Sequence, residues 1–263
     1  MKSQASCLLK EPKPVSLAIE LAEYHVPLAT FDSEAHPFDL RCAQGTRVKV
    51  LNEAMRIIIT RDGSHVIWIS GAAGTGKTSI ALSLCDILAK EPNILLGGTF
   101  FLSRAGNSTK RTSARYVVPT LATLLVRSEP ACKEALIAEL RRDPDFFANT
   151  IKHQIDSLLI KPLNSLKPID ILEPLESQNK PSSSKPLEDS EPVEGSKLLD
   201  RQVVFVIDGL DQCKDEKLLR ELVSSLAEFK SRVPVKWVIT SRPDPRIRKI
   251  RIHRTGLQPR IEL

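Results

Sequence analysis

The sequence lacks a long hydrophobic run. None of its apolar stretches approaches the roughly 20 residues that a membrane-spanning helix needs. The opening residues, MKSQASCLLKEPKPV, hold only Cys7-Leu8-Leu9 before Lys10, which is too short for the core of a signal peptide. We therefore expect no membrane partner and a cytoplasmic location.

Aromatic residues are also scarce. They make up 5% of the 263 residues, a low share for a surface that stacks on nucleic-acid bases. The formal net charge of +6 permits a polyanionic partner but does not require one. We therefore do not expect nucleic acid to be the partner.

The cysteines are few and scattered. They are five, an odd number, and none forms a CxxC pair, which argues against both a disulfide scaffold and a zinc site. Cys85 and Cys213 lie in or beside apolar patterns, so we expect them to be buried free thiols. A reducing, intracellular environment fits this cysteine usage.

What the sequence does contain is an alternation of helix and strand patterns. The hydrophobic share of 41% and the charged share of 27% are ordinary for a globular protein. The apolar periodicity predicts helices over 47–60, 77–90, 119–127, 130–142 and 215–230, and strands over 65–70, 98–103, 203–207 and 235–240. This alternation predicts an α/β fold with a mostly parallel sheet. The continuous apolar strands predict that helices cover both faces.

These elements form one domain with a polar insert. Residues 1–45 give weak signals, so we expect a weakly structured segment in which His36 is a surface histidine. Residues 46–173 and 198–263 are expected to be the two parts of the core. The segment 174–197 holds four prolines, six serines and five acids with almost nothing to bury, which predicts a disordered insert.

A glycine-rich stretch stands between the first predicted strand and the helix at 77–90. Its residues GAAGTGKT (71–78) match G-x-x-x-x-G-K-[ST], after a strand and at the start of a helix as this pattern requires. Glycines let the backbone wrap closely, and the free N–H groups of the helix start attract phosphate oxygens. We expect Lys77 to contact the β- and γ-phosphates and Thr78 to ligate Mg²⁺. The predicted nucleotide-binding residues are Gly71, Ala72, Ala73, Gly74, Thr75, Gly76, Lys77, Thr78 and Ser79.

Two acids follow the predicted strand at 203–207. In a parallel sheet, ligands bind beyond the carboxyl ends of the strands, so Asp208 is expected to face the Mg²⁺ held by Thr78. Asp211 is expected to orient the attacking water. Both acids have an alternative interpretation as caps, Asp208 of a helix or loop and Asp211 of the helix that starts near Asp215.

An arginine, Arg242, also comes at the end of a buried strand. A guanidinium there is suited to sense or stabilise a γ-phosphate, and an ordinary surface arginine is the alternative. The run Arg242–Arg254 contains six Lys or Arg residues and one acid. A solvated basic face is the simpler interpretation of this run, and contact with nucleic acid or an acidic partner is the other.

Four stretches together resemble the NACHT NTPases of the type abundant in filamentous fungi, namely WISGAAGTGKTSIA, GGTFFLSR, VVFVIDGLDQC and WVITSRPDPRIR. The segment CAQGTRVKVL (42–51) looks like the one that precedes their nucleotide domain. The resemblance implies an ASCE-type P-loop NTPase core, a three-layer sandwich that binds ATP or GTP with Mg²⁺. It also implies a signalling switch of the STAND class, in which the nucleotide state controls self-association.

The resemblance also implies roles for individual residues. Carried over by position, Lys77 and Thr78 are the Walker A pair and Asp208 is the Walker B acid. Asp211 is then the water-orienting acid and Arg242 the sensor arginine. The implied catalytic residues are Lys77, Asp211 and Arg242, and the implied metal ligands are Thr78 and Asp208.

One position departs from the family pattern. Family members usually carry Glu after the second acid, where this sequence has Gln212. A neutral amide is a poor proton acceptor, so a general-base role at this position is lost. We therefore expect slow hydrolysis, or binding without turnover. The family's winged-helix region and C-terminal repeats have no counterpart in the sequence, so we expect an isolated module, a fragment or a short gene product.

Four hypotheses follow. The first is a signalling NTPase module, and the second is a nucleotide-gated interaction protein without significant hydrolysis. The third is a small-molecule or nucleoside kinase on the same scaffold, because the loop after Ser103 carries the arginines that a kinase lid needs, Arg104, Arg111 and Arg115. The fourth is a nucleic-acid-dependent ATPase, which the basic run favours and the low aromatic content opposes.

Overall fold

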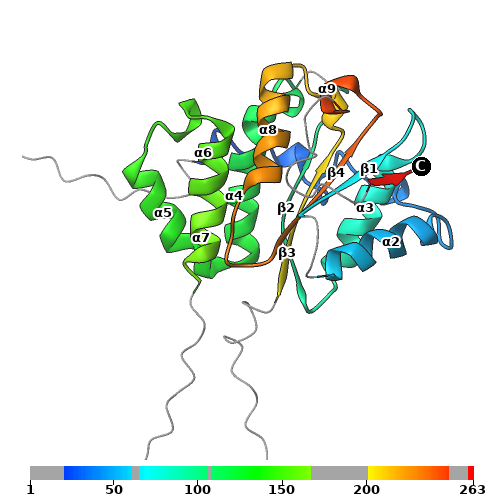
Figure 1. Ribbon diagram of the computed structural model, residues 1–263, viewed down its shortest axis with the longest axis horizontal. Helices are drawn as coiled ribbons and strands as arrows, with labels where there is room; N and C mark the ends of the chain where they lie inside the picture. Colours follow the sequence, from blue (N-terminus) through cyan, green and yellow to red (C-terminus); the bar gives the residue numbers. More distant parts are fainter. Residues whose placement is uncertain (1–20, 61–64, 106–107, 167–200, 249–259) are drawn as a thin grey trace, which may run out of the picture.

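A five-stranded parallel sheet forms the centre of the molecule (Figure 1). The computed structural model describes residues 21–60, 65–105, 108–166, 201–248 and 260–263. Within them, the strands lie in the order β2-β3-β4-β1-β5 and pair in parallel. The strands are β1 (Val66–Ser70), β2 (Ile94–Phe101), β3 (Gln202–Asp208), β4 (Val235–Ser241) and β5 (Arg260–Glu262). The predicted α/β class with a mostly parallel sheet is confirmed.

Helices cover both faces of this sheet, as Figure 1 shows. One face carries α2 (Val48–Ile59) and α3 (Lys77–Leu88). The opposite face carries α4 (Val117–Ser128), α5 (Lys133–Arg142), α6 (Ile151–Ile155), α7 (Lys161–Asn164) and α8 (Glu216–Glu228). A π-helical turn, Asp156–Ile160, joins α6 to α7, and the short α9 (Pro245–Arg248) follows β4. In the described part of the chain, no helix is long and apolar enough to cross a membrane.

The central strands are mainly apolar because both of their faces are covered, and their polar residues, such as Gln202 and Lys236, are buried as well. Every residue of β1, β3 and β4 is buried, and alternate residues of β3 belong to two separate clusters, one on each face. In one cluster Phe205 stacks on Trp237 of β4, with ring centroids 4.6 Å apart. Cys85 and Cys213 are buried free thiols, as predicted.

Most of the predicted elements are confirmed. The helices predicted at 47–60, 77–90, 119–127 and 215–230 correspond to α2, α3, α4 and α8, and the one at 130–142 to a 3₁₀ turn followed by α5. The strands predicted at 65–70, 203–207 and 235–240 correspond to β1, β3 and β4. The predicted disordered insert at 174–197 lies outside the described residues, and so does the part of the basic run between 249 and 254.

The strand predicted at 98–103 is misplaced, because β2 starts earlier and contains both Gly97 and Gly98. The register of β2 against β3 shifts at these glycines, which marks a bulge. A Cβ on Gly97 would lie 2.8 Å from the Phe205 ring. Glycine is therefore needed here for close packing inside a strand, although the same dipeptide more often marks a boundary.

The helical stretch 151–164 has no counterpart among the predicted elements. Its residues Ile155, Leu158 and Leu159 are buried against α4, α5 and α8, and Thr150 caps its first turn. Both the apolar spacing and the capping threonine are helix signals. The sequence therefore carried enough information to predict this element.

The prediction of a surface histidine at position 36 is wrong. His36 is only 6% exposed. Its Nδ1 lies 2.8 Å from the Thr30 carbonyl oxygen, and its ring lies against Phe101 of β2. Arg41 holds this part of the chain to α3 through an ion pair with Asp86 of 2.9 Å. The residues around position 36 thus pack against the sheet, which their irregular sequence does not show.

Candidate functional site

The glycine-rich loop joins β1 to α3 at the carboxyl end of the sheet. Gly74 and Gly76 have φ angles of +77° and +84°, which glycine adopts without steric cost. A Cβ on Gly71 would lie 2.7 Å from Thr75 Oγ1, so close packing requires this glycine as well. Gly76 is the N-cap of α3, whose first N–H groups lack partners within the helix. The loop and the helix start thus form a cradle of donors suited to phosphate oxygens.

Lys77 extends its side chain over this loop. Its Nζ donates to the carbonyl oxygens of Gly71 at 2.9 Å and Ala72 at 2.6 Å. Burial lowers the pKa of Lys77, while the carboxylates of Asp211 and Asp208 act in the opposite direction. The ammonium is held by neutral oxygen atoms, for which the charged oxygens of a phosphate are stronger replacements.

Asp208, the last residue of β3, faces this loop. The Thr78 hydroxyl donates to its Oδ2 at 2.8 Å, and the Thr240 hydroxyl donates to its Oδ1. Asp208 is only 2% exposed. Burial raises the pKa of Asp208, and the hydrogen bonds from Thr240 and Thr78 oppose this effect. The partners of Asp208 are hydroxyls from two other elements, which differs from the helix-capping alternative.

Asp211 is paired with Arg242. Arg242 Nε lies 3.2 Å from Asp211 Oδ2, and the backbone N–H of Arg242 donates to Oδ1 at 2.9 Å. The Asp211 side chain is 12% exposed and the Arg242 side chain 60%. The cap of α8 is Asp215, whose Oδ1 accepts from the Leu218 N–H. The capping alternative for Asp211 is therefore wrong, and its carboxylate faces the end of β4.

Gln212 links two loops. Its Oε1 accepts from the backbone N–H of Arg104 at 2.8 Å. Arg104 in turn donates through its guanidinium to the carbonyl oxygens of Gln212 and Asp211, at 3.1 and 3.3 Å. The loop that follows β2 is thus tied to the loop that follows β3. The amide at this position has a structural partner that sequence reasoning did not anticipate.

These groups surround a cavity of about 270 Å³. It is lined by Ala73, Gly74, Gly76, Lys77 and Thr78 of the loop and helix start, and by Asp208, Asp211 and Arg242. A second cavity of about 480 Å³ shares Asp211, Gln212 and Arg242 with the first. Of the predicted nucleotide-binding residues, Gly71, Ala72, Thr75 and Ser79 do not line the first cavity.

The residues around the first cavity fit a magnesium-bound triphosphate. In the described part of the chain, no group of three or more His, Cys, Asp and Glu side chains could hold a metal ion by itself. The hydroxyl of Thr78 beside the carboxylate of Asp208 is instead a sparse ligand set. Such a set suits Mg²⁺, which keeps several waters and takes further oxygens from phosphates.

Two residues at this site have no role in the sequence-based predictions. Thr240 lies near the end of β4 beside Asp208, and its hydroxyl oxygen also accepts from the Gly209 N–H at 3.0 Å. A hydroxyl residue near the carboxyl end of a buried strand is a sequence signal from which Thr240 could be predicted as a site residue. Arg47 Nη2 donates to the Thr75 carbonyl oxygen at 3.0 Å. No spacing in the sequence relates those two residues.

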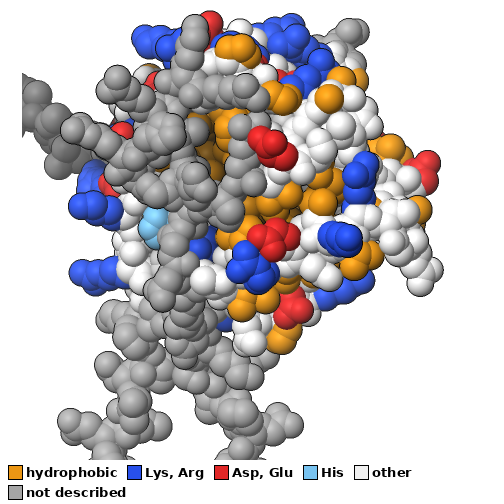
Figure 2. Space-filling view, turned by 45° about the vertical axis from the view of Figure 1, so that its right-hand side comes forward, with side chains coloured by type: hydrophobic (Ala, Val, Ile, Leu, Met, Phe, Trp, Pro, Cys, Tyr) orange, Lys and Arg blue, Asp and Glu red, His pale blue; other side chains and the backbone are white. Residues whose placement is uncertain are grey.

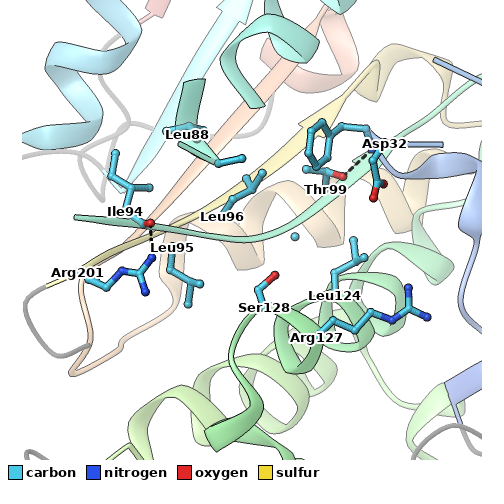
Figure 3. Close-up of a pocket in the computed structure, with 13 residues that line it drawn as sticks. Asp32, Leu88, Ile94, Leu95, Leu96, Thr99, Leu124, Arg127, Ser128 and Arg201 are labelled. Atoms are coloured by element: carbon cyan, nitrogen blue, oxygen red, sulfur yellow. Dashed lines mark hydrogen bonds between the residues drawn. The ribbon is translucent and has the colours of Figure 1, made fainter. Parts of the chain in front are cut away.

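A further cavity of about 330 Å³ lies along β2 from Ile94 to Thr99, between this strand and α4 (Figure 3). Apolar side chains such as Leu96 and Leu124 line much of it. The guanidinium of Arg201 is bound to the Ile94 carbonyl oxygen at 2.8 Å. This cavity shares no lining residue with the one at the glycine-rich loop, so the two are separate sites.

A comparison with curated proteins finds no match. The model of one protein family, described as Nephrocystin 3, N-terminal, matches residues 45–172 and 169–242. The matched residues include the glycine-rich loop, both acids and Arg242, and they make up more than half of the sequence. The chain therefore belongs to the Nephrocystin 3, N-terminal family.

Proposed function

We propose that the chain is a nucleoside triphosphate-binding signalling switch module of the NACHT and STAND type, with slow Mg²⁺-dependent hydrolysis. The observation that carries this proposal is the convergence of Lys77, Thr78 and Asp208 on one cavity. β4 lies between β1, which leads into the loop, and β3, which ends in the acid. This strand order supports an ASCE-type P-loop core.

In this proposal the phosphates of ATP or GTP lie in the glycine-rich loop. Lys77 exchanges its carbonyl partners for β- and γ-phosphate oxygens, and the loop N–H groups donate to the same chain of phosphates. Thr78 would hold Mg²⁺ directly and Asp208 through water. When bound, the ion offsets the negative charge that the phosphates carry.

The remaining two residues supply the switch. Asp211 orients the attacking water and Arg242 senses the γ-phosphate, yet the two side chains are bound to each other at 3.2 Å. An incoming phosphate competes for the guanidinium of Arg242 and thereby frees Oδ2 of Asp211, while Oδ1 still accepts from the Arg242 N–H. Because Asp211 must first be released, this exchange supports slow turnover.

Equilibrium titration with labelled ATP and GTP, with and without Mg²⁺, tests the proposal. We expect wild type to bind and Lys77→Ala to bind at least about tenfold more weakly, because a charge-assisted contact to phosphate is lost. Lys90→Ala is the matched control, since Lys90 follows the same helix and is exposed. Absence of binding at millimolar nucleotide in wild type would remove the proposal.

A nucleotide-gated interaction protein without significant hydrolysis is the second candidate. The observation that favours it is Gln212, whose amide is a poor base and whose Oε1 is occupied by the Arg104 N–H at 2.8 Å. Hydrolysis measured in wild type beside Gln212→Glu separates the two candidates. If only the variant turns over, the second candidate holds. If wild type hydrolyses nucleotide and the change has no effect, the second candidate loses its support.

The contacts of the described arginines do not favour the kinase alternative, and part of the basic run on which the nucleic-acid alternative rests lies outside the described residues. Of the three arginines considered for a lid, Arg111 is buried, Arg104 holds carbonyl oxygens beside the cavity and Arg115 donates to the Phe147 carbonyl oxygen. On the face shown in Figure 2, acidic and basic side chains lie among hydrophobic ones. Phosphoryl transfer to nucleosides, or hydrolysis stimulated by single-stranded nucleic acid, would revive these alternatives.

Self-association controlled by the nucleotide is part of the proposed switch. Size-exclusion chromatography with light scattering, in the presence of Mg²⁺ with and without a non-hydrolysable triphosphate, measures it directly. We expect a larger particle with the triphosphate than without it. The same size in both conditions would leave nucleotide binding in place and remove the assembly step.

A further inference from the structure

Arg47 has an unusual backbone conformation. Among the residues that the structure describes, it is the only one besides glycines with a positive φ, at 57° with ψ 14°. This left-handed region is sterically disfavoured for any residue with a Cβ. The Arg47 side chain makes no capping hydrogen bond to α2, so the helix start does not account for it. Strained residues of this kind persist where the surrounding structure holds them, and they cluster at functional sites.

The chain before Arg47 is fixed along α3. Arg41 is paired with Asp86 at 2.9 Å, and the backbone N–H of Cys42 donates to Ser83 Oγ at 2.9 Å. From these two contacts the chain proceeds toward the amino end of the same helix, where Arg47 meets the glycine-rich loop. The left-handed backbone thus stands at the point where the chain leaves α3 and enters α2.

The contact of Arg47 with the glycine-rich loop involves the peptide group between Thr75 and Gly76. Arg47 Nη2 donates to the Thr75 carbonyl oxygen at 3.0 Å. In a trans peptide the C=O and N–H bonds point in opposite directions, so the N–H of Gly76 points away from the guanidinium. Gly76 lines the cavity of about 270 Å³ described above, and Arg47 does not. A cation on the carbonyl oxygen also polarises the peptide and strengthens its N–H as a donor.

We propose that Arg47 is a positioning residue of the phosphate site, which holds the Thr75–Gly76 peptide so that the Gly76 N–H donates to a phosphate oxygen of a nucleoside triphosphate. The inference rests on the proposed function, because it assigns one more residue to the same site. Arg47 acts through the loop and does not touch the ligand. Arg47 therefore increases the affinity for every ligand that carries a chain of phosphates, whichever base the ligand has.

Three variants test this role. Arg47→Ala keeps the Cβ and its backbone strain and removes the guanidinium. Arg47→Gly removes the guanidinium and the strain together. Arg56→Ala is the matched control, because Arg56 lies on the same helix α2 and its guanidinium pairs with Glu53 on the surface at 2.8 Å. Affinities for ATP, GTP and inorganic triphosphate are measured with Mg²⁺, and thermal unfolding is measured without ligand.

We expect Arg47→Ala to weaken binding of the nucleotides and of inorganic triphosphate by the same factor, about tenfold. Arg56→Ala is expected to bind like wild type. Arg47→Gly is expected to unfold at or above the wild-type temperature and still to show the full loss of affinity. A residue that only supports the start of α2 would not separate stability from affinity in this way.

Other outcomes overturn the inference. Wild-type affinity in Arg47→Ala removes it and leaves the proposed function intact. A loss for ATP or GTP without a loss for inorganic triphosphate removes it as well, because Arg47 would then contact the nucleoside. If the wild-type protein binds no nucleotide and no triphosphate, the proposed function fails and this inference fails with it.

Discussion

Thr78 and Asp208 share a hydrogen bond of 2.8 Å although 130 positions separate them in the chain. Thr78 lies in the first turn of α3, which follows β1, and Asp208 is the last residue of β3. In the sheet, β4 lies between β1 and β3. The carboxylate in this contact is buried, since Asp208 is only 2% exposed. Burying an ionised carboxylate costs free energy, which hydrogen bonds from the two threonine hydroxyls offset only in part.

Asp208→Asn is expected to leave the free energy of unfolding at pH 7.5 unchanged or higher. Burial raises the pKa of Asp208 above its usual value. The stability linked to this group is therefore present at acid pH, below the pKa of the unfolded carboxyl, and is lost as pH rises through the folded pKa. The asparagine oxygen accepts from one threonine hydroxyl and its N–H₂ group donates to the hydroxyl oxygen of the other, so both hydrogen bonds persist without the charge.

Urea denaturation of wild type, Asp208→Asn and Asp208→Ala measures this effect. The alanine variant leaves both threonine hydroxyls without their acceptor and is expected to lose about 1–3 kcal/mol. An asparagine variant that loses as much as the alanine variant would show that the ionised carboxylate stabilises the fold, contrary to the account.

Gly97→Ala is expected to lower the free energy of unfolding by about 1–3 kcal/mol. The added Cβ would lie 2.8 and 2.9 Å from atoms of the Phe205 ring. The loss should shrink in a Phe205→Leu background, because the smaller side chain leaves room for the methyl group. Phe205→Leu alone is measured as the reference for this second background. Equal losses for Gly97→Ala in both backgrounds would contradict the packing explanation.

The fall in stability below neutral pH is expected to be smaller in His36→Asn than in wild type. Burial lowers the pKa of His36 from its usual value of 6.5. The unfolded chain therefore takes up a proton before the folded protein does. The stability linked to His36 is present above pH 6.5 and is lost as pH falls through the lower folded pKa. Asparagine retains an N–H for the Thr30 carbonyl oxygen and does not titrate.

Free energies of unfolding at pH 7.5 and pH 5.5 measure this difference. His153→Asn is the matched control, because His153 is exposed on the surface of α6. A wild-type slope that His36→Asn does not change, or one that His153→Asn changes by the same amount, would assign the pH dependence to other groups.

The sequence predicts those parts of the fold whose signals are local. The apolar runs of β1, β3 and β4 and the glycine pattern of residues 71–78 depend on neighbours in the chain, and the structure places them as expected. The meeting of Thr78 with Asp208 follows from one general property, the common edge at which parallel strands end. The structure brings these groups together on one cavity.

The features that the sequence does not predict depend on contacts between distant segments. The burial of His36 requires residues near position 36 to pack on Phe101, and the irregular sequence there carries no periodicity. The strand β5 has three residues and is defined by its pairing with β1 alone. Arg47 meets Thr75 across a turn and a helix boundary, so no spacing rule connects them.

The dependence of nucleotide affinity on Mg²⁺ tests the central claim most directly, which is that Lys77, Thr78 and Asp208 surround one metal-bound triphosphate. We expect wild type to bind ATP or GTP at least about tenfold more tightly with Mg²⁺ than without. Thr78→Val and Asp208→Asn are expected to lose this difference and to keep the affinity measured without Mg²⁺. A Mg²⁺ dependence that survives both substitutions, or a wild-type protein that binds no nucleotide, would contradict the account.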